Sequence, residues 1–180
     1  MTVQKIYTPV IENIVNIIGN VVDNVQAEYD LISSEKPYFE HGHPLEIINT
    51  LKEKTADDTL KFKKFPLIAL FEDFEMESQS GVFKSSTKLN ILFITDTDKN
   101  YKAADRYTNS FDAILTPIYT LFKKHLLRQK GVHVLHKTID HNAIYHLYWG
   151  KKGLYGNDGN IFDDHIDAIE LRGLDVKIYR

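Results

Sequence analysis

Two short segments of this chain are apolar at both odd and even positions, and they constrain the fold more than any other feature. They are Phe65-Pro66-Leu67-Ile68-Ala69-Leu70-Phe71 and Leu89-Asn90-Ile91-Leu92-Phe93-Ile94. A strand that is apolar at both parities must be covered on both of its faces. The segment between them, residues 72–86, is polar and contains Gly81. We therefore predict an antiparallel pair of buried strands joined by a polar loop.

Two long amphipathic helices are predicted outside this pair. Apolar residues recur three and four positions apart over residues 10–29, after a Thr8-Pro9 start signal. The same spacing recurs from Tyr101 to Leu126, and Gly131 is expected to end that helix. Pro117 lies inside the second helix, where we expect a kink because proline lacks a backbone donor.

The remainder of the chain predicts several short strands, at residues 132–135, 143–149, 168–171 and 174–179. The fold class that follows is α+β, with a mainly antiparallel sheet of about five strands and two long helices packed on one face. Residues 1–180 are predicted to form a single domain. Residues 33–64 are expected to be an irregular excursion with one short helix around Leu45 to Leu51.

Composition narrows the classes of function. Twenty-two basic residues stand against 25 acidic ones, and the net charge of −3 gives no strong attraction to nucleic acid. The chain has no cysteine, which removes disulfides, thiolate nucleophiles and cysteine-bearing zinc sites. No segment approaches the roughly 20 apolar residues that a bilayer crossing needs, so no membrane partner is expected.

Known catalytic and nucleotide-binding motifs are missing from the sequence. It contains no G-x-x-x-x-G-K-[ST], G-x-G-x-x-G, G-x-S-x-G or H-E-x-x-H. If their segments are strands, the pairs His133/His136 and His141/His146 lie on opposite faces, whereas a metal needs convergent nitrogens. The loop over residues 156–164 lacks the register of a calcium loop and is better read as an Asn/Gly turn. We expect no enzyme activity, no cofactor and no metal.

One alternative to that expectation rests on Asp96 and Asp98, which follow the second buried strand. Carboxylates at such a position serve divalent-metal nucleases and nucleotidyl-transfer enzymes, with Asp73 as a possible further ligand. The simpler interpretation is that Asp96 or Asp98 caps the helix beginning near Tyr101.

An acidic run is the candidate interface. Glu72, Asp73, Glu75 and Glu77 precede Gly81 in the predicted inter-strand loop. In a ring of identical subunits, symmetry would multiply this run into a collar of like charge. Such a collar would repel the negatively charged DNA backbone and prevent it from binding to the ring.

The order of these segments resembles that of a known family. A strand of the form Phe65-Pro66-apolar run, a second strand over 89–94 and a helix with Arg106-Tyr107-x-x-x-Phe111 followed by Pro117 come after a long N-terminal helix. This pattern resembles the neck and tail-completion proteins of tailed bacteriophages, in particular the tail-terminator type.

The resemblance implies a structural virion protein and no enzyme, cofactor or metal. Such a protein is a small α+β subunit that forms a ring, commonly sixfold, at the head-proximal end of the tail. It would contact tail-tube subunits on one side and a connector or adaptor on the other, while DNA passes through the lumen without specific binding. Its expected location is the neck or tail of the virion, and the host cytoplasm during assembly.

Overall fold

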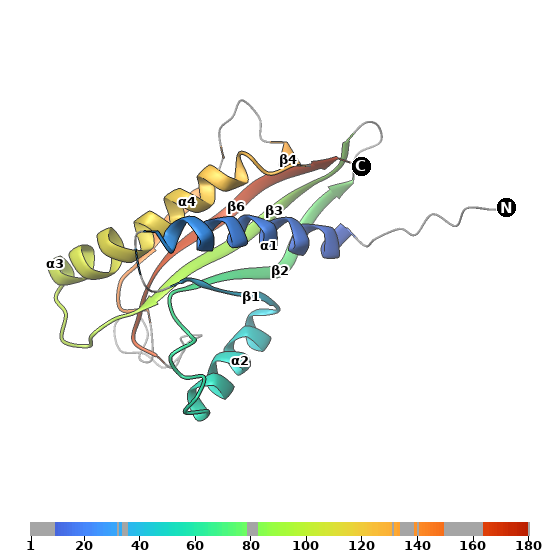
Figure 1. The fold of residues 1–180 in the computed structure, drawn as a ribbon. Helices are drawn as coiled ribbons and strands as arrows, with labels where there is room; N and C mark the ends of the chain where they lie inside the picture. The colour runs from blue at the N-terminus through green and yellow to red at the C-terminus, as the bar shows by residue number, and fades with distance from the viewer. Residues whose placement is uncertain are drawn as a thin grey trace.

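The computed structural model describes residues 10–31, 33, 36–78, 83–130, 132–133, 139, 141–149 and 164–179. These residues form a six-stranded mixed sheet with helices packed on it (Figure 1). The strands are β1 (Tyr38–Gly42), β2 (Leu67–Ser78), β3 (Phe83–Asp96), β4 (Val132–His133), β5 (Asn142–His146) and β6 (Ile166–Tyr179). The helices are α1 (Val10–Tyr29), α2 (Pro44–Ala56) and the consecutive segments α3 (Ala103–Arg106), η1 (Tyr107–Leu115) and α4 (Thr116–Leu126).

The sheet is mainly antiparallel. Its order is β1-β2-β3-β6-β4, and β5 also pairs with β6. The pair β1–β2 is parallel, and the other pairs among the described strands are antiparallel. The predicted α+β class is therefore confirmed, with six strands instead of about five.

The central strands are buried on both faces, as their sequence predicts. Ile68, Leu70, Ile91 and Phe93 belong to one apolar cluster, which includes the buried sides of α1 and α4. The alternating residues Leu67, Ala69, Leu92 and Ile94 belong to a second cluster, which includes Ile47 and Leu51 of α2.

Helices lie on both faces of the sheet, where two long helices on one face were predicted. The two long helices, α1 and α4, do lie side by side over the same face (Figure 1). A third helix, α2, packs on the opposite face, because the apolar side chains of Ala69 and Leu92 there also need cover.

The region 33–64 is more regular than predicted. It contains β1 as well as α2, and together with β2 they form a parallel β-α-β unit. His43 caps α2: its Nδ1 accepts the Leu45 N–H at 3.2 Å, and Glu46 Oε2 accepts the His43 N–H at 3.0 Å. Pro44 takes the first helical position. His43-Pro44 thus begins a helix that runs further, to Ala56, than the short helix predicted around Leu45 to Leu51.

The C-terminal strand is continuous, where two strands were predicted. Leu171 pairs with Ile91 and Leu174 pairs with Leu89, so two residues of β6 face the single Asn90. The second of them, Gly173, has a φ of 69°, and its N–H donates to Asn90 Oδ1 at 3.1 Å. Gly173 therefore forms a bulge within β6 and does not end the strand.

The second long helix adapts to Pro117 through its preceding segment. Residues Tyr107–Leu115 are π-helical, and the Thr116 N–H donates to the carbonyl of Phe111 five residues earlier. A wider turn before a proline relieves the crowding of its ring against the previous turn. The helix ends at Leu126, and the predicted terminator Gly131 lies outside the described residues.

A substitution at Phe122 tests the assignment of the apolar cluster beneath α1 and α4. Its side chain is fully buried and meets Phe93 edge-on, with ring centroids 5.3 Å apart. We expect Phe122→Ala to lower the free energy of unfolding by about 3–5 kcal/mol, through lost transfer energy and a cavity. The matched control is Phe62→Ala, because Phe62 is 65% exposed, and it should change stability by less than about 0.5 kcal/mol. Urea denaturation of both variants measures this, and equal midpoints would contradict the assignment.

Glu28 joins the two long helices and makes their packing pH-dependent. Its carboxylate binds Lys124 and lies 2.9 Å from His125 Nε2, both on α4. The hydrogen bond from Lys124, helped by that from His125, lowers the pKa of Glu28 in the folded protein. A depressed carboxyl pKa stabilises the fold above the unfolded pKa, and this contribution is lost as pH falls through the folded value.

We therefore expect Glu28→Gln to reduce the acid sensitivity of folding. The wild type should lose more stability than the variant between about pH 5 and about pH 3. Urea midpoints across this range measure the difference. Glu53→Gln, at an exposed position of α2, is the control and should follow the wild-type curve.

Candidate functional site

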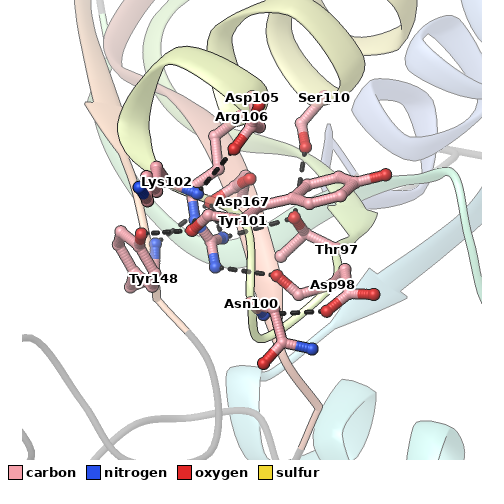
Figure 2. Close-up of polar contacts among 10 residues, drawn as sticks. All are labelled: Thr97, Asp98, Asn100, Tyr101, Lys102, Asp105, Arg106, Ser110, Tyr148 and Asp167. Carbon is pink, nitrogen blue, oxygen red and sulfur yellow. Dashed lines mark hydrogen bonds and ion pairs between the residues drawn. The ribbon is translucent and has the colours of Figure 1, made fainter.

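A buried ion pair lies at the end of the sheet where β3 leads into α3. Arg106 and Asp167 are both fully buried, and Arg106 Nη1 donates to Asp167 Oδ1 at 2.8 Å (Figure 2). Arg106 begins the Arg-Tyr-x-x-x-Phe segment, while Asp167 lies near the start of β6, 61 residues away. The pair therefore joins the first turn of the second helix to the central sheet.

The remaining donors of Arg106 bind the turn that connects β3 to α3. Nη2 donates to the carbonyl of Asp98 at 3.1 Å, and Nε donates to the carbonyl of Tyr101 at 3.3 Å. Nη1 also reaches Thr97 Oγ1 at 3.3 Å, which accepts from Ser110 Oγ at 3.4 Å (Figure 2). A single guanidinium thus satisfies the carbonyls of an otherwise irregular turn.

Tyr148 covers this network from the side of β5. Its backbone has a φ of 56°, a left-handed conformation that is unusual for a bulky residue. In this conformation its N–H donates to Asp167 Oδ1 at 3.0 Å, and its ring lies 3.3 Å from the guanidinium carbon of Arg106. The hydroxyl donates to the carbonyl of Tyr101. These contacts offset the backbone strain and close the network.

The second oxygen of Asp167 has no hydrogen-bond partner among the described residues. A buried carboxylate oxygen without a partner costs free energy, which the charge of Arg106 must offset. Because Arg106 binds Asp167, Thr97 and the carbonyls of Asp98 and Tyr101, the arrangement joins helix, turn and sheet.

The structure does not bring the three predicted carboxylates together. Asp98 Oδ1 accepts the Asn100 N–H at 2.8 Å, so this side chain stabilises the turn, whereas Asp105 caps the helix by accepting the Lys102 N–H at 3.0 Å. Asp96 is exposed at the end of β3. Leu67 pairs with Ile94, which puts Asp73 about six residues further along β2, roughly 20 Å from that end. Within the described ranges, no group of three acidic, His or Cys residues could hold a metal ion.

His141 and His146 both have protein partners. His141 Nε2 lies 2.6 Å from the hydroxyl of Tyr119 on α4. His146 Nε2 lies 2.8 Å from a carboxylate oxygen of Glu170, and its ring stacks on Trp149, which packs against the α2 side of the sheet. The predicted opposite orientation of His141 and His146 is confirmed. The side chain of His133, the residue His136 and the predicted turn over 156–163 lie outside the part of the chain that is described.

The candidate interface loop is not a loop over most of its length. Glu72, Asp73, Glu75 and Glu77 belong to β2, and Gly81 lies outside the described residues. The sequence missed this because a run of polar residues within a strand resembles a loop. The register also places Glu75 opposite Lys88, and Lys88 opposite Asp175. A basic residue on β3 thus lies between acidic positions on β2 and β6 across the sheet.

The outer edge of β1 is the first of two sheet edges that no described strand pairs with. Tyr38 donates its N–H to the carbonyl of Pro66 at 2.7 Å, which turns the backbone groups of Phe39 and His41 away from the sheet. Beside this edge a groove of about 420 Å³ separates β1 from α1. Asn16, Asn20 and Asp23 line it from the helix, together with Val15, Gly19, Phe39, Glu40 and His41. His41 Nδ1 is held 2.5 Å from Glu72 Oε1.

The other open edge belongs to β5, which pairs only with β6 among the described strands. Tyr145 of β5 and Tyr107 of η1 are each about half exposed. Both rings contact Phe111, with centroids 5.5 and 5.6 Å away. This short row of exposed aromatic rings is a composition typical of protein interfaces.

No family model, curated protein or solved structure matches this chain. None of the described helices combines the length and apolarity needed to cross a bilayer. Sequence reasoning missed two of the features described above, the Arg106–Asp167 pair and the β1 edge. The one signal in the sequence was Arg106 itself, a charged residue within the otherwise amphipathic second helix.

Arg106 provides a test of the buried tie. We expect Arg106→Met to lower the free energy of unfolding by about 3–5 kcal/mol, because it leaves the charge of Asp167 buried without compensation. Arg106→Met with Asp167→Asn should regain part of that loss, because the Asn oxygen still accepts the Tyr148 N–H while its charge is gone. Asp98→Ala should cost about 1 kcal/mol at most. A double variant less stable than Arg106→Met would contradict this account.

Proposed function

We propose that this protein is a structural subunit of the head–tail junction of a tailed bacteriophage, forming a ring as a tail terminator, tail-completion protein or neck connector. The observation that carries the proposal is that two unlike edges of its sheet, the outer side of β1 and the outer side of β5, have no partner strand among the described residues. Unlike surfaces that bind each other join subunits head to tail, and a head-to-tail series closes into a ring when its rotation permits.

The resemblance to the tail-terminator type adds support through the places its motif residues occupy. The strand after Phe65-Pro66 and the second apolar strand are neighbours in the centre of the sheet. Arg106 ties the helix to that sheet, and Phe111 is buried against it. Each motif residue has a structural contact, which suits a protein that acts through its surfaces.

The proposed ring has tail-tube subunits on one side and a connector or adaptor on the other. DNA passes through its lumen without specific binding, which agrees with a net charge of −3. The subunit resides in the neck or tail of the virion and passes through the host cytoplasm during assembly.

Assembly of the purified chain tests this proposal. We expect light scattering after size exclusion to report one closed oligomer, and electron microscopy to show rings of uniform size. Antibody labelling of purified virions should then place the protein at the junction of head and tail. A chain that remains monomeric at every concentration and is missing from the particles would overturn the proposal.

A further inference from the structure

We propose that neighbouring copies join by pairing β5 of one copy with the outer edge of β1 of the next, so that one sheet continues from subunit to subunit. This inference rests on the proposed ring, and it names the surfaces that build it. Both edges are strands of five residues, so neither extends beyond the other when they pair. Strand addition at an open edge supplies main-chain hydrogen bonds without any change of fold.

The directions of the strands agree with this joint. β1 is parallel to β2, and three antiparallel steps lead from β2 through β3 and β6 to β5. β5 therefore runs opposite to β1 within one copy. A rotation about an axis along the strands leaves these directions unchanged. In a ring with such an axis, β5 of one copy meets β1 of the next as an antiparallel pair, the arrangement that dominates the sheet.

The side chains that would meet at the joint lie on the same face of the sheet. Tyr145 pairs in register with Ile169 and contacts Phe111, so it lies on the face covered by α1 and α4. Phe39 pairs with Ile68, which puts the groove beside β1 on that same face. When the sheet continues across the joint, the exposed ring of Tyr145 enters the groove of the next copy, beside Phe39.

The charges beside the two edges are of opposite sign. Asp23 lines the groove, and α1 contains no Lys or Arg. On the other side, α4 carries Lys123, whose ammonium lies 3.9 Å from the centre of the Tyr119 ring, next to His141 and β5. An acidic helix at one edge and a basic helix at the other favour head-to-tail contact over contact between two like edges.

A proline at position 41 tests the main-chain part of the joint. The His41 N–H points away from the sheet, so His41→Pro removes no main-chain hydrogen bond within the subunit but blocks an added strand. We expect His41→Pro to keep the circular dichroism spectrum of the wild type and to remain monomeric. The matched control, His41→Ala, removes the contact with Glu72 and should still form rings. A folded His41→Pro variant that forms rings would overturn the inference.

Charge reversal tests the same joint independently, including the case in which His41→Pro does not fold. Asp23→Lys and Lys123→Glu should each weaken assembly roughly tenfold or more, because each puts like charges across every joint. An equimolar mixture of the two variants should assemble, because alternating copies restore opposite charges at every joint. Lys99→Glu, at an exposed position after β3, is the control and should assemble as the wild type does.

The outcomes separate this inference from the proposed function. If rings form but tolerate His41→Pro and both charge reversals, the subunits join elsewhere; the joint is overturned while the ring stands. If the mixture fails to assemble and either variant yields dimers, like edges pair and the head-to-tail joint is wrong. If the wild type never assembles, both the joint and the ring are overturned.

Discussion

The burial of both faces of the central strands determines the layout of the whole molecule. Because β2 is apolar at every position over residues 67–71, and β3 over residues 91–94, each face of the sheet needs its own cover. The paired helices α1 and α4 provide it on one side, and α2 provides it on the other (Figure 1). The connection through β1 and α2 places this third helix on the second face. It also leaves β1 as an edge strand of the sheet.

The Arg106–Asp167 pair contributes at one point of this layout, where the second long helix begins. A buried ion pair adds little stability over apolar residues of the same size, because desolvation offsets the attraction. Its contribution here is positional: four hydrogen bonds from one rigid guanidinium hold the turn over 97–101 in one placement relative to β6. The left-handed backbone of Tyr148 is tolerated because three of its contacts depend on it.

The spacing of apolar residues predicted those helices and strands whose burial follows directly from that spacing. The helix over 10–29 and the two apolar runs were found because their period reflects burial directly. β1 was missed because a short edge strand is held by its partner β2, and residues such as Glu40 and His41 have no apolar alternation. Gly173 was read as a break, since a bulge and a strand end have the same sequence signal. The tie between Arg106 and Asp167 spans 61 residues, beyond any local spacing.

The two open edges present a physical problem that a ring would solve. Unpaired edge strands invite uncontrolled pairing, and proteins limit this with short edges, charges, bulges or closure. Both edges here are only five residues long, and His41 and Glu40 hold their own partners, Glu72 and Lys54. These devices discourage contact with arbitrary strands, yet the groove and Tyr145 remain accessible on matching faces. Joining unlike edges around a closed ring pairs every β1 with a β5 and leaves neither exposed, which an open filament cannot do at its ends.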